Sequence, residues 1–265
     1  MTILHVIPRS LTPRQQETAE RDAVRALAVE ARHLRKSLPR GISVHPLVLR
    51  GEAVKAIVGY AAKVNAELVV MGRGGARALR EAFLGSTAER VIRKAKLPVL
   101  VVRLAPRAAY AQPAVAVDID GTGDGVVHEL LRLVPPPRPG VAAIHAYEVP
   151  HAGLVYPSLA NDEVEDANEV LQRKATRELD RLLRLAVSHA NVPGGDAPAW
   201  RTHVREGSPS LVVAKVLRRG RHDLLVLGTR GYSAAAHLFL GTVSGELLRE
   251  VKCDVLLVPP KASGK

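Results

Sequence analysis

Short apolar runs alternate with longer segments of helical periodicity along this chain of 265 residues. In the second half, the runs Ala114–Val117 and Leu224–Leu227 are continuously apolar, which is typical of strands buried on both faces. Between them, the segment 162–189 repeats its apolar residues at helical spacing (Leu171, Ala175, Leu179, Leu182, Leu183 and Ala186). Strands separated by helices predict an α/β fold with a doubly wound parallel sheet.

The remaining elements follow from the same patterns and from local start and stop signals. We expect further strands at 3–6, 141–149, 200–204 and 255–258, and a helix from Gly121–Gly125 to the Pro135 stop. Ser208 and Pro209 predict a helix start with a serine cap. Thr12 and Gln15 predict a capping box. The helix that follows it is expected to bury one face (Val24, Leu27, Ala31, Leu34 and Leu38).

A glycine pattern occurs twice, 156 residues apart, and identifies an internal repeat. Each copy follows an apolar strand and has the form Gly, two residues, Gly, nine residues, Gly, then Ser or Thr. Its glycines are Gly72, Gly75 and Gly85 in the first copy and Gly228, Gly231 and Gly241 in the second. A strand, a glycine turn and a helix N-terminus together offer backbone N–H groups to an anion.

The two copies are unequal in length. His5 aligns with His145, but the first half has no counterpart of the strand and helix at 114–133. The sequence therefore predicts a first domain at residues 1–105 that lacks its opening strand and helix, a linker, and a complete domain at 112–260. We call these the first and second repeats.

Composition narrows the function classes. The formal charge of +12 invites a nucleic-acid partner, but aromatic residues are only 3% of the chain, too few for base-stacking platforms. We expect most basic residues on solvated helix faces and no nucleic-acid binding. Neither a signal peptide nor a run of about 20 apolar residues is visible, so a cytoplasmic protein without membrane contact is expected. The single Cys253 leaves no internal disulfide or zinc cluster, and it is expected to be a packed or edge thiol and not a nucleophile.

On the doubled glycine pattern and the ending Lys96–Val102, the chain resembles the nucleotide-binding branch of the universal stress protein family. The resemblance implies two tandem doubly wound parallel-sheet domains of the adenine nucleotide alpha hydrolase-like type, the first truncated. It also implies an ATP-binding stress-response or regulatory protein, with ATP (with or without Mg²⁺) as cofactor and an adenine nucleotide as the small-molecule partner. The last strands of its domains would pair antiparallel, within the chain or in a homo-oligomer.

The resemblance assigns the site residues to the second repeat. Asp118 would contact ribose and adenine, and Ala146 would line the adenine pocket. The ribose and phosphates would meet Leu227, Gly228, Arg230, Gly231, Gly241, Thr242, Val243 and Ser244. The first repeat keeps weaker candidates but no aspartate (Gly72, Gly75, Gly85, Ser86 and Thr87). Its site is therefore expected to bind nucleotide poorly or only through the phosphates. No catalytic or metal residues are expected, and at most slow ATP hydrolysis.

Three questions stay open at this stage. The chain could be an interaction scaffold with vestigial nucleotide sites. Asp118-Ile119-Asp120 also resembles the opening motif of haloacid-dehalogenase-type phosphatases, with Asp118 as nucleophile and Asp120 as acid/base. The gap left by the missing strand of the first repeat could be closed by direct pairing of its neighbours, by another chain, or by residues upstream of Met1.

Overall fold

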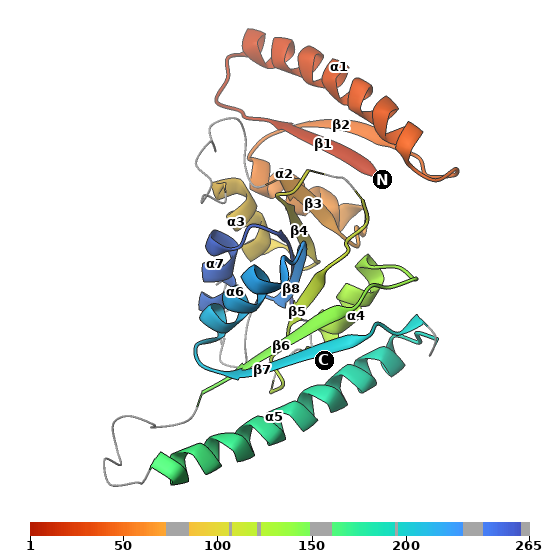
Figure 1. Ribbon diagram of the computed structural model, residues 1–265. Coiled ribbons are helices and arrows are strands. Elements are labelled where there is room, and N and C mark those ends of the chain that lie inside the picture. Colours follow the sequence, from red (N-terminus) through yellow and green to blue (C-terminus); the bar gives the residue numbers. More distant parts are fainter. Residues whose placement is uncertain are drawn as a thin grey trace. The chain divides into compact units, whose positions relative to one another are not determined.

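The structure is a computed structural model that describes residues 1–72, 85–105, 108–120, 123–148, 161–193, 196–229 and 241–260, with side chains from 168 onward in the segment 161–193. It has two compact units, Met1–Ala66 and Glu67–Lys265 (Figure 1). We call them the N-terminal unit and the main unit. The main unit contains the whole second repeat and also the last two strands of the first. None of the described helices combines the length and apolar character that a membrane span requires.

The N-terminal unit pairs two parallel strands and packs two helices on them. Its elements are β1 (Thr2–Ile7), α1 (Pro13–Ser37), β2 (His45–Arg50) and α2 (Ala53–Lys63). Its core is small, with five buried hydrophobic residues (Ile7, Ala31, Val44, Val54 and Ala61). This unit therefore buries little apolar surface for its length.

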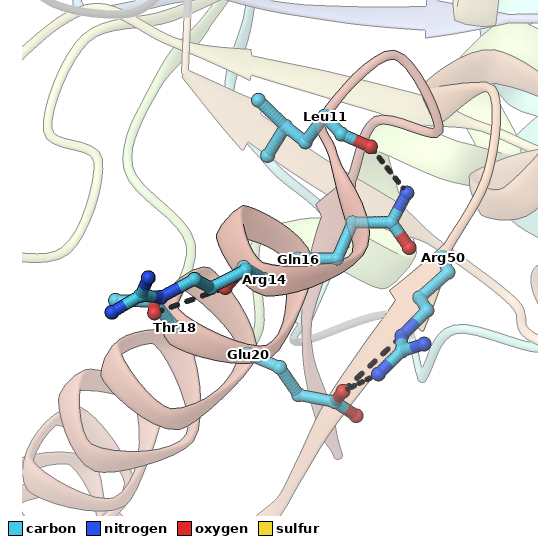
Figure 2. Close-up of polar contacts among 6 residues, drawn as sticks. All are labelled: Leu11, Arg14, Gln16, Thr18, Glu20 and Arg50. Carbon is cyan, nitrogen blue, oxygen red and sulfur yellow. Dashed lines mark hydrogen bonds and ion pairs between the residues drawn. The ribbon is translucent and has the colours of Figure 1, made fainter.

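The predicted capping box at the start of α1 is confirmed. The Thr12 side chain accepts a hydrogen bond from the Gln15 amide, and the Gln15 side chain accepts one from the Thr12 amide. Figure 2 shows the polar contacts that follow: Gln16 Nε2 donates to the Leu11 carbonyl at 2.8 Å. One turn further on, an ion pair between Glu20 and Arg50 joins α1 to the end of β2. Local signals thus define this helix start.

The predicted core face of α1 is only partly correct. Ala31 is buried, and Leu27, Leu34 and Leu38 are half-buried. Val24 is 50% exposed, so its predicted burial was wrong. Helical periodicity identifies the more apolar face of a helix, but burial of that face requires another element to cover it.

The main unit is built on a seven-stranded sheet with the order β3-β4-β9-β8-β5-β6-β7 (Figure 1). The strands are β3 (Val69–Gly72), β4 (Val99–Val102), β5 (Pro113–Ala116), β6 (Val141–Tyr147), β7 (Trp200–Glu206), β8 (Leu224–Gly228) and β9 (Asp254–Val258). Each neighbouring pair is parallel except β4 and β9. The α/β, parallel-sheet prediction is confirmed, and β5 lies at the centre of the second repeat between β8 and β6.

The described residues of the main unit also form five helices: α3 (Ser86–Lys94), α4 (Gly123–Leu133), α5 (Asn161–His189), α6 (Pro209–Gly220) and α7 (Thr242–Glu250). Within the second repeat, α4 packs beside α5 and α6 beside α7, on opposite faces of the sheet (Figure 1). The proline start of α6 is confirmed, but Ser208 makes no side-chain cap hydrogen bond. Its hydroxyl lies 3.3 Å from the Ser210 hydroxyl instead. A serine at this position offers a cap, and its rotamer decides whether the cap forms.

The last strands of the two repeats pair antiparallel within the chain, as expected. Val99 pairs with Leu257 and Val101 with Val255. On their other sides, β4 pairs with β3 and β9 with β8, so both strands already have two partners. Self-association of the chain stays a prediction.

A buried carboxylate fastens the linker to this junction. Asp254, at the start of β9, accepts hydrogen bonds from the Arg103 amide at 2.7 Å, the Leu104 amide at 2.9 Å and the Tyr110 hydroxyl at 2.8 Å. Asp254 as a whole residue is only 4% exposed. Because burial and this hydrogen bond both favour the neutral phenol, the pKa of Tyr110 is raised.

The first repeat is divided between the two units. Among the described strands, β1 and β2 form a two-stranded sheet, whereas β3 and β4 belong to the seven-stranded sheet. Val70 of β3 is 57% exposed. The three alternatives for the gap left by the missing strand stay predictions.

Candidate functional site

A cavity of about 230 Å³ lies at the carboxyl ends of β5, β6 and β8 in the second repeat. In open parallel sheets, ligands bind beyond these strand ends, where the strand order reverses. The order around β5 is such a point, because the chain continues from β5 to β6 on one side and later returns to β8 on the other. The fold itself therefore favours this cavity as the binding site.

Asp118 stands at the edge of the cavity, directly after β5. It is half-buried, and its Oδ1 accepts a hydrogen bond from the Asp120 amide at 3.2 Å. The strand end beneath it is held by His145, a buried residue whose Nδ1 lies 2.9 Å from the Val117 carbonyl. The histidine is thus a structural link between β5 and β6. The second carboxylate oxygen of Asp118, Oδ2, has no hydrogen-bond partner among the described residues.

The start of α7 forms the opposite wall. Ser244 is buried, and its hydroxyl donates to the Gly228 carbonyl at 2.7 Å, which ties the first turn of α7 to the end of β8. The Gly241 amide donates to the Thr229 carbonyl at 2.8 Å and is therefore already satisfied. Gly241 is the N-cap and supplies no side-chain cap.

The next three amides of α7 are different. Within the described residues, the N–H groups of Thr242, Val243 and Ser244 have no hydrogen-bond acceptor. The first turn of any helix leaves such donors unsatisfied, and the helix dipole makes this end attractive to an anion. The α7 start therefore offers three amides to a negatively charged group.

Gly123 closes the cavity floor at the start of α4. A Cβ atom at this position would lie 2.8 Å from both a Leu182 methyl carbon and a Val117 methyl carbon, and 2.9 Å from the Asp118 carbonyl oxygen. Any side chain would push α4 away from the end of β5. The glycine is required by close packing, since a larger residue would displace the strand end that carries Asp118.

The structure brings most of the predicted site residues together. Six of them line the cavity (Asp118, Ala146, Leu227, Gly228, Val243 and Ser244). Gly241 and Thr242 adjoin it at the N-terminus of α7. Arg230 and Gly231 lie outside the described residues.

Sequence reasoning missed the rest of the lining, which is apolar except for His145. These residues are Ala116, Val117, Gly123, Val126, Ile144, His145, Pro209 and Val213. The signal that could have found some of them is helical spacing: Pro209 and Val213 are four residues apart on α6, and Gly123 and Val126 are three apart on α4.

The first copy of the glycine pattern is built differently. Gly72 ends β3 and is exposed, and Gly85 is the N-cap of α3, again without a side-chain cap. Ser86 is exposed and Thr87 half-buried, while Gly75 lies outside the described residues. The first repeat keeps the helix N-terminus but has no counterpart of β5, α4 or Asp118.

A sequence profile of the universal stress protein family matches residues 1–103 and again residues 114–259. The chain belongs to the universal stress protein family. The two matches also confirm the tandem arrangement, with the first copy the shorter. The exact domain limits, 1–105 and 112–260, stay a prediction.

Individual relatives agree with this family. A universal stress protein of Methanocaldococcus jannaschii is 46% identical over 63 residues, which are 24% of this chain and 37% of that protein. A universal stress protein A-like protein of Arabidopsis thaliana is 30% identical over 98 residues, 37% of this chain and 54% of that one. The matches thus span about a third to a half of these relatives' own lengths.

Solved structures of the family share the fold over nearly the whole chain. A universal stress protein from Archaeoglobus fulgidus superposes with a TM-score of 0.68 at 18% identity, covering 98% of this chain and 87% of that one. A putative universal stress protein from Pseudomonas aeruginosa gives a TM-score of 0.65 at 16% identity, covering 98% and 93%. At this identity, the likeness concerns the fold alone.

The phosphatase alternative finds no support at the site. Asp120 is exposed and does not line the cavity, and its amide is used to hold Asp118. A nucleophile and an acid/base pair would need both carboxylates to face one substrate. In the described residues, no three His, Cys, Asp or Glu side chains gather as metal ligands.

Proposed function

We propose that the second repeat binds ATP in the cavity between β5, β6 and β8, and that nucleotide occupancy regulates a stress response. The observation that carries this proposal is the meeting of three features around one cavity: Asp118, apolar walls, and the α7 amides that have no acceptor among the described residues. Each of these features suits a different part of a nucleotide.

The apolar walls suit the base. Val117, Ile144 and Val213 bury their side chains around the cavity, and Ala146 leaves space at the end of β6. A planar base gains affinity from such walls, while a few polar groups fix its orientation. Asp118 can accept hydrogen bonds from ribose hydroxyls or the adenine amino group, and a carboxylate makes stronger bonds of this kind than a neutral acceptor.

The α7 start suits the phosphates. The cavity of about 230 Å³ is smaller than the usual range for ligand pockets, about 300–1,000 Å³, so it would hold the nucleoside and leave the phosphates at its rim. There the amides of Thr242, Val243 and Ser244 would receive them, favoured by the helix dipole. The domain would then sense nucleotide by binding, with no more than slow hydrolysis.

Calorimetric titration of the full chain with ATP tests this proposal. Asp118→Ala should weaken binding by about 10- to 100-fold, the usual value of a hydrogen bond to a charged group. Asp120→Ala is the matched control, because it removes a neighbouring carboxylate that does not line the cavity, and its affinity should stay within about twofold of the wild type. Equal losses in both variants would contradict the assigned site. No saturable binding to the wild type would leave the interaction scaffold as the better description.

A second variant checks the base pocket independently. Ala146→Phe places a ring where the base is expected, at a half-buried strand end where the fold can accommodate it. We expect loss of ATP binding with an unchanged melting temperature. Full affinity in this variant would mean that the base lies elsewhere.

A further inference from the structure

A second cavity, of about 500 Å³, runs between the edge strand β7 and helix α6. We call it the β7–α6 groove. It shares no lining residue with the cavity at the strand ends. Most of its polar lining is basic (Arg201, His203, Arg205, Lys215, Arg219 and His222).

The periodicities of strand and helix explain why these residues meet. Side chains at alternate positions of a strand share one face, so Arg201, His203 and Arg205 line the same side of β7. Residues four apart share one face of a helix, so Lys215 and Arg219 point from α6 toward them. Two stretches that look like ordinary solvated surface in the sequence thus converge on one groove.

The positive charges of the groove exceed the negative charge that the described residues bring to it. In the described part of the chain, Arg201, Arg205, Lys215 and Arg219 form no ion pair. Arg201 donates to the Gln112 side chain at 2.9 Å and Arg205 to the Val204 carbonyl at 3.0 Å, and both acceptors are neutral.

An arginine beside the groove, in contrast, does form an ion pair. Arg218, next to Arg219, pairs with Glu250 at 2.6 Å. The one acidic residue of the groove, Glu206, already accepts a hydrogen bond from Asn168 at 2.8 Å. Four cations thus face one another with a single carboxylate, Glu206, among the described lining, so a net repulsion remains that a bound polyanion would relieve.

The groove is a property of the second repeat and not of the fold. Counted back by the repeat interval of 156 residues, the positions of Arg201, His203 and Arg205 hold His45, Leu47 and Leu49. Lys215 corresponds to Gly59 and Arg219 to Lys63, so among the arginines and lysines of the groove only Arg219 keeps an arginine or lysine counterpart. The same scaffold positions therefore carry a concentrated charge in one copy only, which a requirement of folding would not explain.

We propose that the β7–α6 groove binds a small anion that carries a chain of phosphate groups. Its volume lies within the usual range for small-molecule pockets, about 300–1,000 Å³. Arginine and lysine side chains from two directions suit consecutive phosphates. Single-stranded nucleic acid is disfavoured, because the described lining of the groove contains no Phe, Tyr or Trp to stack a base.

His203 gives the groove an internal reporter. Its pKa is lowered, first by burial and then by the nearby charges of Arg205, His222 and Arg201. A bound polyanion would offset those charges and raise the pKa. This reporter is specific for the groove, since His203 does not line the other cavity.

Titration with inorganic tripolyphosphate at low and moderate salt tests the proposal in the full chain. The double variant Lys215→Gln, Arg219→Gln should lose about tenfold or more in affinity. The matched control Lys174→Gln, Arg184→Gln removes the same charge from exposed positions of α5 and should stay within about twofold. Equal losses in both variants, or no saturable binding to the wild type, would overturn the proposal.

Two further measurements test where the ligand binds and which class of phosphate compound the groove recognises. The ring signals of His203, assigned with His203→Gln, should show a raised pKa when tripolyphosphate saturates the protein; an unchanged pKa would place the ligand elsewhere and refute the groove. ATP that binds the groove no more tightly than tripolyphosphate would identify the phosphate chain as the recognised part, and tighter binding would identify a nucleotide. An oligonucleotide that displaces tripolyphosphate at lower concentration would overturn the assignment in favour of nucleic acid.

Discussion

Strand β6 of the second repeat lies between β5 and β7, and five of its seven residues are buried. Its counterpart in the first repeat, β1, pairs with β2 alone among the described strands and buries one residue of six. The next pair differs in the same way: four of five residues are buried in β8, and none of four in β3. The difference does not come from the strands' own composition, because Ile3-Leu4-His5-Val6 is at least as apolar as Ala143-Ile144-His145-Ala146.

The element that separates the two repeats is the β5–α4 segment. In the second repeat, β5 pairs with both β6 and β8, and α4 packs against α5. The same segment supplies Asp118, Gly123 and Val126 to the cavity. One strand and one helix therefore supply both a pairing partner for β6 and β8 and part of the lining of the cavity at the strand ends.

The largest expected effect concerns the long helices. Leu179 of α5 is 0% exposed, whereas Leu27 of α1 is half-buried. Leu179→Ala should lower the free energy of unfolding by about 3 kcal/mol, because it leaves a cavity in a packed core. Leu27→Ala should lower the free energy of unfolding by about 1 kcal/mol, since a half-buried side chain contributes less buried apolar surface and leaves no enclosed cavity.

Urea unfolding measures both variants. The fluorescence of Trp200, the single tryptophan, follows the main unit, and circular dichroism follows the helices of both units. Equal losses for the two leucines would mean that α1 is covered as well as α5, and the comparison of the repeats would fail.

The next effect concerns the start of the last strand, where the repeats also differ. Asp254 corresponds to Pro98 of the first repeat, which has no side-chain acceptor. Asp254→Ala should cost about 2 kcal/mol, because it removes the buried carboxylate that accepts from the Arg103 and Leu104 amides and from the Tyr110 hydroxyl. Asp254→Asn keeps one acceptor oxygen and should cost less. Urea unfolding followed by Trp200 tests the order; an equal cost for both would show that the amides do not depend on this oxygen.

The smallest effect concerns Cys253, whose counterpart in the first repeat is Leu97. The thiol is buried, and burial, partly offset by Arg103, raises its pKa to about 12. The native state holds this proton more tightly than the unfolded chain does. Cys253 therefore leaves the free energy of unfolding independent of pH below about pH 8.5 and lowers it as the pH rises above that value. In Cys253→Ala, the free energy of unfolding measured by urea unfolding should fall less between about pH 8.5 and higher pH than it does in the wild type.

Thiol chemistry provides the direct check on Cys253. A disulfide reagent at pH 8 should react with it only as the protein unfolds, since the thiolate is the reactive form. Rapid stoichiometric reaction of the native protein would contradict the buried, protonated thiol. The expectation of a packed thiol is already consistent with its burial.

Several parts of this molecule could be predicted from sequence because their causes are local or repeated. The Thr12–Gln15 box needs only residues three apart, and the continuous apolar run Leu224–Leu227 is enough to predict a buried strand. The resemblance to a known family predicted the antiparallel pairing of β4 with β9 and the gathering of Asp118, Ala146 and Gly228 around one cavity.

The parts that could not be predicted depend on what lies opposite a residue. Val24 has the right helical spacing, but nothing in the sequence shows that its face stays open. The tight fit around Gly123 involves Leu182, far along the chain. The basic residues of β7 and α6 were expected on solvated surfaces, and only the packing of these two elements makes them one groove.

Hydrogen exchange of the amides with and without saturating ATP tests the central claim most directly, because both copies of the glycine pattern are read in one sample. The account predicts slower exchange in the segment that contains Thr242, Val243 and Ser244, and no change at the matching positions Ser86, Thr87 and Ala88 at the start of α3. Equal protection of both helix starts, or protection of neither, would contradict the claim that the β5–α4 segment makes the second repeat the nucleotide site.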